Sequence, residues 1–153
     1  MLNNSEHVAA MREALGEARL APLHEDVPIG AVLLRDGEIV ARAHNRREVD
    51  HDPTAHAEVL ALRQAASLFG TSRLDGTTLV VTLEPCAMCA GAILLARVET
   101  VIFGADDPKA GAFGSLYNFG ADPRLNHSVM VVPGVLASEG AELLTSFFAA
   151  RRG

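Results

Sequence analysis

The sequence contains only two cysteines, no tryptophan and one tyrosine among its 153 residues. With a single possible cysteine pair, a disulfide framework and a four-cysteine zinc site are both excluded. No apolar stretch approaches the ~20 residues that a membrane-spanning helix needs. No basic start followed by an apolar run indicates a signal peptide. We therefore expect a cytoplasmic protein in which both thiols stay reduced.

Positive charge is also scarce, since 13 Lys and Arg stand against 19 Asp and Glu, for a formal net charge of −6. This balance argues mildly against a nucleic-acid partner, because phosphate binding needs local positive potential. Net charge does not describe one face of a protein, however, so a nucleic-acid partner stays open. The length and the 49% of hydrophobic residues predict that residues 1–153 form one domain.

Hydrophobic periodicity predicts alternating helices and strands along the chain. The helical segments are residues 5–20, 56–69, 86–97 and 139–151. The short apolar segments expected as strands are residues 29–35, 38–44, 78–83, 100–103 and 129–132. Asp36-Gly37 predicts a hairpin between the first two strands, and Ser5 is the expected cap of the first helix.

The order of these elements after the hairpin favours a parallel sheet with right-handed crossovers and helices on both faces. Residues 104–127 form a long connection rich in Gly, Pro, Asp and Asn. Connections of this length in compact domains are usually functional or disordered. The sequence therefore predicts an α/β fold with one long loop near its carboxyl-terminal part.

Two short strings carry metal-binding chemistry: His56-Ala57-Glu58, and Pro85-Cys86-Ala87-Met88-Cys89. Cys86 and Cys89 are three residues apart, so both sulfurs point the same way from a first helical turn. His56 and Glu58 are rotated by roughly 200° in a helix interior and share a direction only at its start. The strings therefore predict two helix starts that face each other across a metal ion.

His56, Cys86 and Cys89 are three zinc donors, and Glu58 is a free carboxylate beside them. A zinc ion with three protein ligands keeps one position open for catalysis. It lowers the pKa of a bound water to roughly 7, and Glu58 is the acid placed to take that proton. In this order the strings are the signature of zinc-dependent nucleobase deaminases.

Two other interpretations of these strings remain open. A Cys-x-x-Cys pair in a reduced compartment is also typical of thioredoxin-like redox proteins, but that leaves His56 and Glu58 without a role. A purely structural zinc site needs a fourth protein ligand. The histidines that could supply it are His24, His44, His51 and His127.

The chain resembles the bacterial tRNA-specific adenosine deaminases along nearly its whole length. The strings that carry the resemblance are DVPIGAV at 26–32, DPTAHAE at 52–58, TLEPCAMCAGA at 82–92, FGA at 103–105, Asp107, Lys109, Gly111, Ala112, Gly114, Ser115, Leu116, Asn126-His127 and Phe147-Phe148. The strings around the zinc donors are shared by all cytidine-deaminase-like enzymes. Residues 107–116 are more particular to the tRNA branch.

The resemblance implies a three-layer α-β-α sandwich with a five-stranded mixed sheet, a zinc cofactor and a homodimer. It implies that His56, Cys86 and Cys89 bind zinc and that Glu58 shuttles protons. The implied reaction is hydrolytic deamination of adenosine to inosine at the wobble position of an arginine tRNA anticodon. Residues 90–96 are an apolar run that fits either the dimer interface or the core.

The resemblance also implies that Asn45, Ala57 and Asp107 contact the substrate. Asn45 and Asp107 have a simpler interpretation as turn residues, since Asn and Asp favour turns and Asp107 precedes a proline. Asp106 departs from the basic residue expected at its position. The basic residues left to meet RNA are Arg46, Arg47, Lys109, Arg124, Arg151 and Arg152, and the loop aromatics are Phe113, Tyr117 and Phe119.

Two rival functions follow from the same residues. The same chemistry acts on free bases or nucleosides of the guanine or cytosine type, and the net charge favours such small substrates. A non-catalytic, zinc-stabilised RNA-binding module would instead have a closed set of four protein ligands. Residues 107–116 favour tRNA over both rivals.

Overall fold

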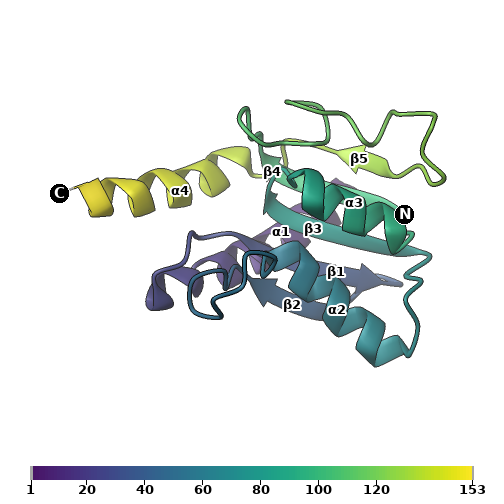
Figure 1. Ribbon diagram of the computed structural model, residues 1–153, viewed down its shortest axis with the longest axis horizontal. Coiled ribbons are helices and arrows are strands. Elements are labelled where there is room, and N and C mark those ends of the chain that lie inside the picture. Colours follow the sequence, from purple (N-terminus) through teal and green to yellow (C-terminus); the bar gives the residue numbers. More distant parts are fainter. Residues whose placement is uncertain (1, 153) are drawn as a thin grey trace.

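A five-stranded mixed sheet forms the centre of the protein in the computed structural model, which describes residues 2–152 (Figure 1). The strands are β1 (Gly30–Arg35), β2 (Glu38–His44), β3 (Thr77–Leu83), β4 (Thr100–Ala105) and β5 (Met130–Val132). Their order is β2-β1-β3-β4-β5. Strands β3, β4 and β5 are parallel, whereas β1 is antiparallel to both of its neighbours. The five-stranded mixed sheet is confirmed, and the wholly parallel sheet that the element order favours is limited to three strands.

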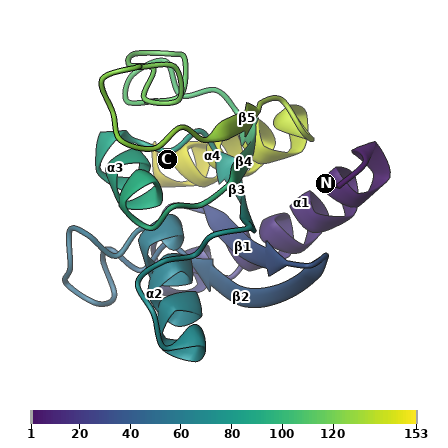
Figure 2. The ribbon, with the colours of Figure 1, turned by 90° about the vertical axis from the view of Figure 1, so that its right-hand side faces the viewer.

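Four α-helices cover the sheet, two on each face (Figure 2). They are α1 (Asn4–Ala18), α2 (Ala57–Phe69), α3 (Ala87–Leu95) and α4 (Ala137–Arg152), and a short 3₁₀ helix, η1 (Ala21–His24), follows α1. Helices α2 and α3 pack on one face, while α1 and α4 pack on the other. The predicted three-layer α-β-α architecture is confirmed.

Strict alternation along the central strands divides the apolar residues between two cores. In β1, Ala31 and Leu33 face α2 and α3, whereas Val32 and Leu34 face α1. Successive strand side chains point to opposite faces, and both faces are covered, so β1 is apolar almost throughout. The turn at Asp36-Gly37 has positive φ at both residues, as a tight two-residue hairpin requires.

The predicted cap of the first helix is wrong by two residues, because Asn3 rather than Ser5 is the N-cap. The Asn3 side chain accepts a hydrogen bond from the Glu6 amide at 3.0 Å, and the Glu6 carboxylate accepts one from the Asn3 amide at 3.4 Å. This reciprocal pair satisfies two amides that a helix start leaves free. Ser5 lies inside the first turn and lacks an acceptor three residues later, since that residue is Val8.

The sheet brings several carboxyl ends of strands to one edge. His44, at the end of β2, pairs with Gly30, and Val81, near the end of β3, pairs with Ala31. The segments that leave β2 and β3 lead into α2 and α3, so both helices begin above this edge (Figure 1). Among the described residues, no helix has the length and apolar character needed to cross a membrane.

Candidate metal centre and active site

The starts of α2 and α3 meet above the sheet edge and bring together the two strings singled out in the sequence. His56 is the N-cap of α2 and Cys86 is the N-cap of α3, both with extended backbone. Cys89 follows in the first turn of α3 and is buried. The expectation that two helix starts face each other is therefore met by the geometry.

The spacing of the three donor atoms suits a tetrahedral cation. His56 Nδ1 lies 3.7 Å from the Cys86 sulfur and 3.4 Å from the Cys89 sulfur. All three donor atoms lie within 4.8 Å of one another. Zinc bonds of roughly 2.0 Å to nitrogen and 2.3 Å to sulfur place tetrahedral donors about 3.6 Å apart. The cluster is thus able to hold a metal ion of this size.

The two thiols differ in acidity because they are hydrogen-bonded to each other. A hydrogen bond from Cys89, helped by His56, lowers the pKa of Cys86 to about 4 against the opposing effect of burial. The same bond, together with burial, raises the pKa of Cys89. A divalent cation stabilises both thiolates at once, because its charge offsets their repulsion and their desolvation. The chemistry of the donor set therefore fits a metal ion.

Glu58 lies beside the donors but is not one of them. It is the second residue of α2, is only 4% exposed and lies against the Cys89 thiol. Burial raises the pKa of its carboxyl group above the ordinary value, because the charged form loses hydration. A buried carboxyl group with a raised pKa is suited to accept and return a proton.

The histidines considered as a fourth metal ligand are placed elsewhere. His24 contacts Asp26 at 2.7 Å and His44 at 3.1 Å. His127 Nε2 lies 2.7 Å from the Val98 carbonyl, at the far end of α3. Among residues 2–152, the cluster of potential metal donors consists of three side chains, with no histidine from this set.

The first two predicted substrate residues lie at the same edge of the sheet. Asn45 directly follows β2 and is buried, with its amide group donating to the Val27 carbonyl and its carbonyl accepting from the Arg47 amide. These bonds fix a turn, so the simpler interpretation of Asn45 describes its local role. Ala57 is the buried first residue of α2, where helix amides have no intrahelical acceptor.

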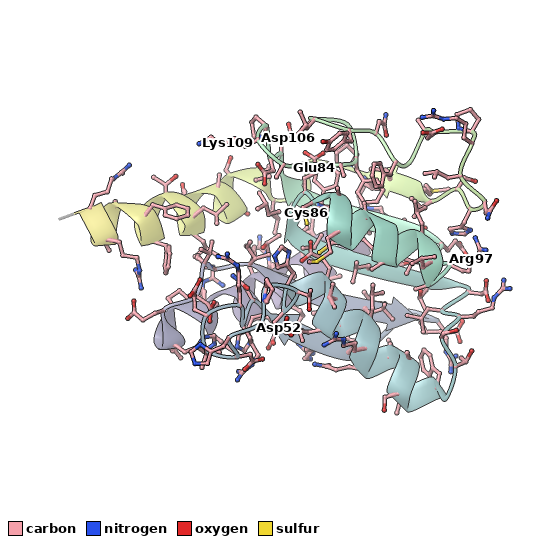
Figure 3. The ribbon with its side chains drawn as sticks, viewed as in Figure 1. Asp52, Glu84, Cys86, Arg97, Asp106 and Lys109 are labelled. Atoms are coloured by element: carbon pink, nitrogen blue, oxygen red, sulfur yellow. The ribbon has the colours of Figure 1, made fainter. Side chains whose placement is uncertain are left out.

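Asp107, the third predicted substrate residue, also starts a turn. Its carboxylate accepts from the backbone amides of Lys109 and Ala110 at 3.1 and 3.2 Å. It lies in the long connection between β4 and β5, in the part that passes over the start of α3. Figure 3 shows Asp106 and Lys109 in this connection above Glu84 and Cys86.

Glu84 and Asp26 hold the loops that follow β4 and β2 at this site. Neither residue was predicted from the sequence to have a role there. Glu84 is 2% exposed and accepts hydrogen bonds from the connection after β4. Burial alone raises its pKa, but the bonds from Ser115 and from backbone amides outweigh burial and hold the pKa below its usual range. Asp26 is fully buried and accepts from the amides of Glu48 and Val49 at 2.7 and 3.2 Å. For Glu84 the available signal was an acid placed directly between an apolar strand and a proline.

Most of the basic residues proposed to meet RNA are paired with acids of the same chain. The ion pairs are Arg46–Asp50, Arg47–Glu48, Arg124–Asp122 and Arg151–Glu25. Each of these pairs involves exposed or half-exposed side chains, and such pairs contribute only about 0–1 kcal/mol. A phosphate group is therefore able to replace an acid at low cost.

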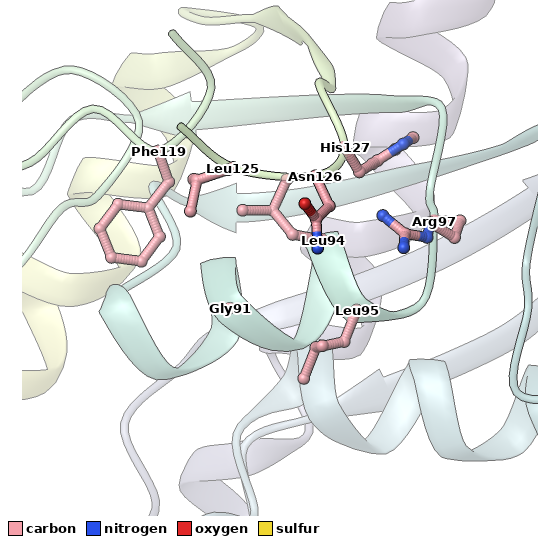
Figure 4. A pocket seen from close by; sticks show the side chains of 8 residues that line it. All are labelled: Gly91, Leu94, Leu95, Arg97, Phe119, Leu125, Asn126 and His127. Carbon is pink, nitrogen blue, oxygen red and sulfur yellow. The ribbon is translucent and has the colours of Figure 1, made fainter. Parts of the chain in front are cut away.

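A hollow separate from the metal cluster lies between α3 and residues 119–127 (Figure 4). Its lining is mainly apolar, with Leu94, Leu95 and Phe119 on its walls. A second hollow on the other side of Leu95 is lined by residues of α2 and α3. Leu95 itself is 82% exposed, so the outer face of α3 is an apolar surface.

Comparison with known proteins gives consistent results along the whole chain. Residues 5–152 match the family described as MafB19-like deaminase. The tRNA-specific adenosine deaminase of Bacillus subtilis is 54% identical over 138 residues, covering 90% of this chain and 86% of that protein. The protein of the same name from Agrobacterium fabrum is 46% identical over 148 residues, covering 97% of each.

Two solved structures differ in how similar they are to this chain. A structure from work on A-to-I editing by tRNA:A34 deaminases superposes with a TM-score of 0.86 and 47% identity, over 89% of this chain and 99% of that one. The guanine deaminase from Nitrosomonas europaea superposes with a TM-score of 0.78 and 25% identity, over 93% and 84%. Similarity is thus greater to the first structure in both fold and sequence.

Proposed function

The chain belongs to the MafB19-like deaminases and to the tRNA-specific adenosine deaminases, and we propose that it converts adenosine to inosine at the wobble position of a tRNA anticodon. The observation that carries this proposal is the 54% identity over 90% of the chain. The guanine-deaminase structure shares half of that identity or less, which disfavours a free base as substrate. In this proposal, residues 1–153 act as a single zinc-dependent deaminase domain. A tRNA substrate also favours a cytoplasmic location for the enzyme.

His56, Cys86 and Cys89 hold a zinc ion through Nδ1 and the two sulfurs, and their spacing supports this assignment. Zinc bound there would lower the pKa of its water to roughly 7, so that this water would lose a proton and become a nucleophile near neutral pH. Glu58 takes a proton from the attacking water, because it is the buried carboxyl group beside the donors. The same group hands the proton to the base.

The reaction is a balanced hydrolysis at C6 of adenine. Water adds its oxygen to C6, the bond from C6 to the amino nitrogen breaks, and ammonia leaves as the carbonyl of inosine forms. Glu58 donates the first proton of the water to the ring nitrogen, and it then takes the second proton from the new C6 hydroxyl and donates it to the departing amino group. Asn45 binds the nucleoside, the free amide of Ala57 helps to hold the base, and Asp107 contacts the anticodon loop.

The substrate is an anticodon loop, by resemblance that of an arginine tRNA, whose target base is already nearly unstacked. Lys109 is exposed above the site (Figure 3). Arg46 and Arg47 follow Asn45 and exchange their acidic partners for phosphates. This local supply of cations accounts for RNA binding by a chain with a net charge of −6.

The active unit is a homodimer formed through the outer face of α3. Leu95 and Met88 are large apolar side chains exposed on this helix. Two apolar hollows that Leu95 lines extend the surface, and Figure 4 shows the one between α3 and residues 119–127. A contiguous apolar surface of this kind marks an interaction site. The partner that it fits is a second copy of the same face, because a two-fold contact is self-complementary.

The substrate assignment is tested by comparing one tRNA with free bases. The zinc-loaded protein is incubated with an arginine tRNA that carries adenosine at the wobble position, and separately with guanine, cytosine and adenosine. We expect the wobble adenosine to be read as guanosine in sequencing, with ammonia released in equal amount. Rapid ammonia release from guanine or cytosine, without a change in the tRNA, would favour the free-base deaminase. No turnover of any substrate would favour the binding module.

A further inference from the structure

The loop of residues 106–118 is organised around one buried carboxylate that comes from a different element. Glu84 directly follows β3, and its two oxygens accept from the backbone amides of Asp107, Phe113 and Ser115 at 3.0, 3.0 and 3.1 Å. The Ser115 hydroxyl donates to the same carboxylate. Glu84 is 2% exposed, so water does not substitute for these bonds. Three amides of the loop therefore depend on one side chain.

The loop is shaped to leave space for this carboxylate. Gly111 lies against it so closely that an added Cβ would stand 2.3 to 2.5 Å from the carboxyl atoms of Glu84. No side chain fits at such a distance, so any other residue at this position displaces either the loop or the carboxylate. The loop and the acid are thus matched in shape as well as in hydrogen bonding.

The outer side of the loop carries the groups that suit RNA. Gly111, Ala112 and Phe113 are buried, whereas Leu116 and Tyr117 are 53% and 52% exposed. Lys109 is exposed on the same loop and forms no ion pair within the described part of the chain. An exposed aromatic ring and a cation on one loop provide stacking and phosphate contacts to single-stranded RNA.

The inner side of the loop is joined to the segment that carries a metal donor. The Ala112 amide donates to the Pro85 carbonyl at 2.8 Å, and Gly111 forms an isolated bridge with Cys86. Figure 3 shows Glu84 between Cys86 and the residues Asp106 and Lys109. Glu84 and Pro85 thus hold the loop, and the next residue, Cys86, is a metal donor. The loop is therefore attached directly beside the reacting centre.

We propose that Glu84 is a positioning residue for the tRNA, holding the 106–118 loop in the conformation that meets the nucleotides around the target base. This inference rests on the proposed function and assigns a residue that does not touch substrate or metal. Because the zinc donors come from α2 and α3, the loss of Glu84 is expected to weaken RNA binding while leaving the chemical step almost unchanged. A residue that merely supports Cys86 would instead affect zinc content and the chemical rate.

The test compares Glu84→Gln, Glu84→Asp and Asp75→Asn with the unaltered protein, all loaded with zinc. Glu84→Gln keeps the size but turns an amide group toward the donors of the loop. Glu84→Asp keeps the charge but withdraws it by one methylene. Asp75 lies just ahead of the amino end of β3, is exposed and pairs with Arg73, so Asp75→Asn removes an equal charge far from the loop. The readouts are zinc content, melting temperature, and KM and kcat on an anticodon stem-loop RNA.

We expect Glu84→Gln to raise KM for the RNA about tenfold or more, with kcat within threefold and one zinc per chain retained. Glu84→Asp is expected to restore part of the lost affinity, and Asp75→Asn to match the unaltered protein. An unchanged KM, or a fall in kcat accompanied by zinc loss, would overturn the proposal. Failure of the unaltered protein to deaminate the RNA would instead count against the proposed function, so the two failures are distinguishable.

Discussion

At the residue scale, the proposed reaction depends on a carboxyl group that lies among the potential metal donors without being one. Glu58 is buried beside Cys89, and burial raises its pKa. Its neighbours His56 and Cys86 point their donor atoms at each other across the same small space. In the proposed mechanism, this arrangement separates the group that moves protons from the groups that hold the cation.

Replacing Glu58 by glutamine is expected to abolish deamination without loss of metal. The amide cannot take up a proton, and general acid–base catalysis of this kind contributes roughly 10²- to 10⁴-fold to a rate. Zinc per chain is measured by elemental analysis and inosine by sequencing of the tRNA. Glu13→Gln, which alters an exposed acid paired with Arg42, is the matched control and is expected to leave both unchanged. Retention of more than a tenth of the activity in Glu58→Gln would refute the shuttle assignment.

The convergence of the four proposed site residues could be predicted because the proposed chemistry requires a characteristic spacing. Cys86 and Cys89 need a helix start to point together, and His56 and Glu58 need another. Glu84 could not be predicted in the same way. Its partners lie 23 to 31 residues further along the chain, so its role appears only when the loop after β4 folds back over the start of α3. The local sequence pattern around Glu84 does not indicate that its hydrogen-bond donors lie so far along the chain.

At the scale of elements, periodicity predicted the four α-helices and the five strands of the described residues, with ends displaced by a few residues, but not the 3₁₀ helix η1. The error at the first N-cap shows why ends are harder to predict. Asn3 and Ser5 are both good capping residues, and the choice depends on Glu6 being three residues after Asn3. The antiparallel pairing of β1 with β3 was also beyond local pattern, because it depends on which edge of the hairpin joins the rest of the sheet.

The packing of α1 on β1 depends on a missing side chain. A Cβ at Gly30 would stand 2.1 Å from the Ala14 carbonyl oxygen and 2.4 Å from the Ala18 amide nitrogen. Gly30→Ala is therefore expected to lower the free energy of unfolding by about 3 kcal/mol or more, since a backbone atom cannot yield cheaply. Urea unfolding at neutral pH measures the change.

Gly16 in α1 provides the contrasting variant, because a Cβ there meets nothing within 4 Å. Gly16→Ala is expected to raise the free energy of unfolding by about 0.5–1 kcal/mol through helix propensity alone. Equal effects of the two substitutions would show that the close approach of α1 to β1 is not as described.

At the scale of the whole molecule, the exposed apolar face of α3 predicts association of two chains. Leu95→Glu places a charge at the centre of this face and is expected to convert the dimer to a monomer in light scattering. Leu23 in η1 is 80% exposed, nearly as much as Leu95, but lies on a different element. Leu23→Glu is expected to leave the mass unchanged. A monomeric unaltered protein, or a dimer that survives Leu95→Glu, would contradict the proposed interface.

Acid is expected to destabilise the protein partly through Asp26. Burial alone raises the pKa of this carboxyl group, but bonds from the Glu48 and Val49 amides and from His24 outweigh burial and lower the pKa overall. A group with a lowered folded-state pKa contributes stability above its unfolded pKa of about 3.9, and this is lost as the pH falls through the folded value.

The variant Asp26→Asn isolates this contribution. At pH 7 it is expected to be less stable than the unaltered protein by about 2–3 kcal/mol, since it loses charge-assisted hydrogen bonds. In urea unfolding the difference is expected to shrink steadily below pH 4. A difference that stays constant between pH 7 and pH 3 would show that the charge of Asp26 does not contribute.

The proposed metal centre is tested most directly by a crystal structure of the zinc-loaded protein with anomalous scattering recorded at the zinc edge. We expect one strong anomalous peak at the starts of α2 and α3, bonded to His56 Nδ1, Cys86 and Cys89. The fourth ligand is predicted to be a solvent molecule within hydrogen-bond distance of Glu58. A peak elsewhere, or a fourth protein side chain completing the tetrahedron, would contradict it.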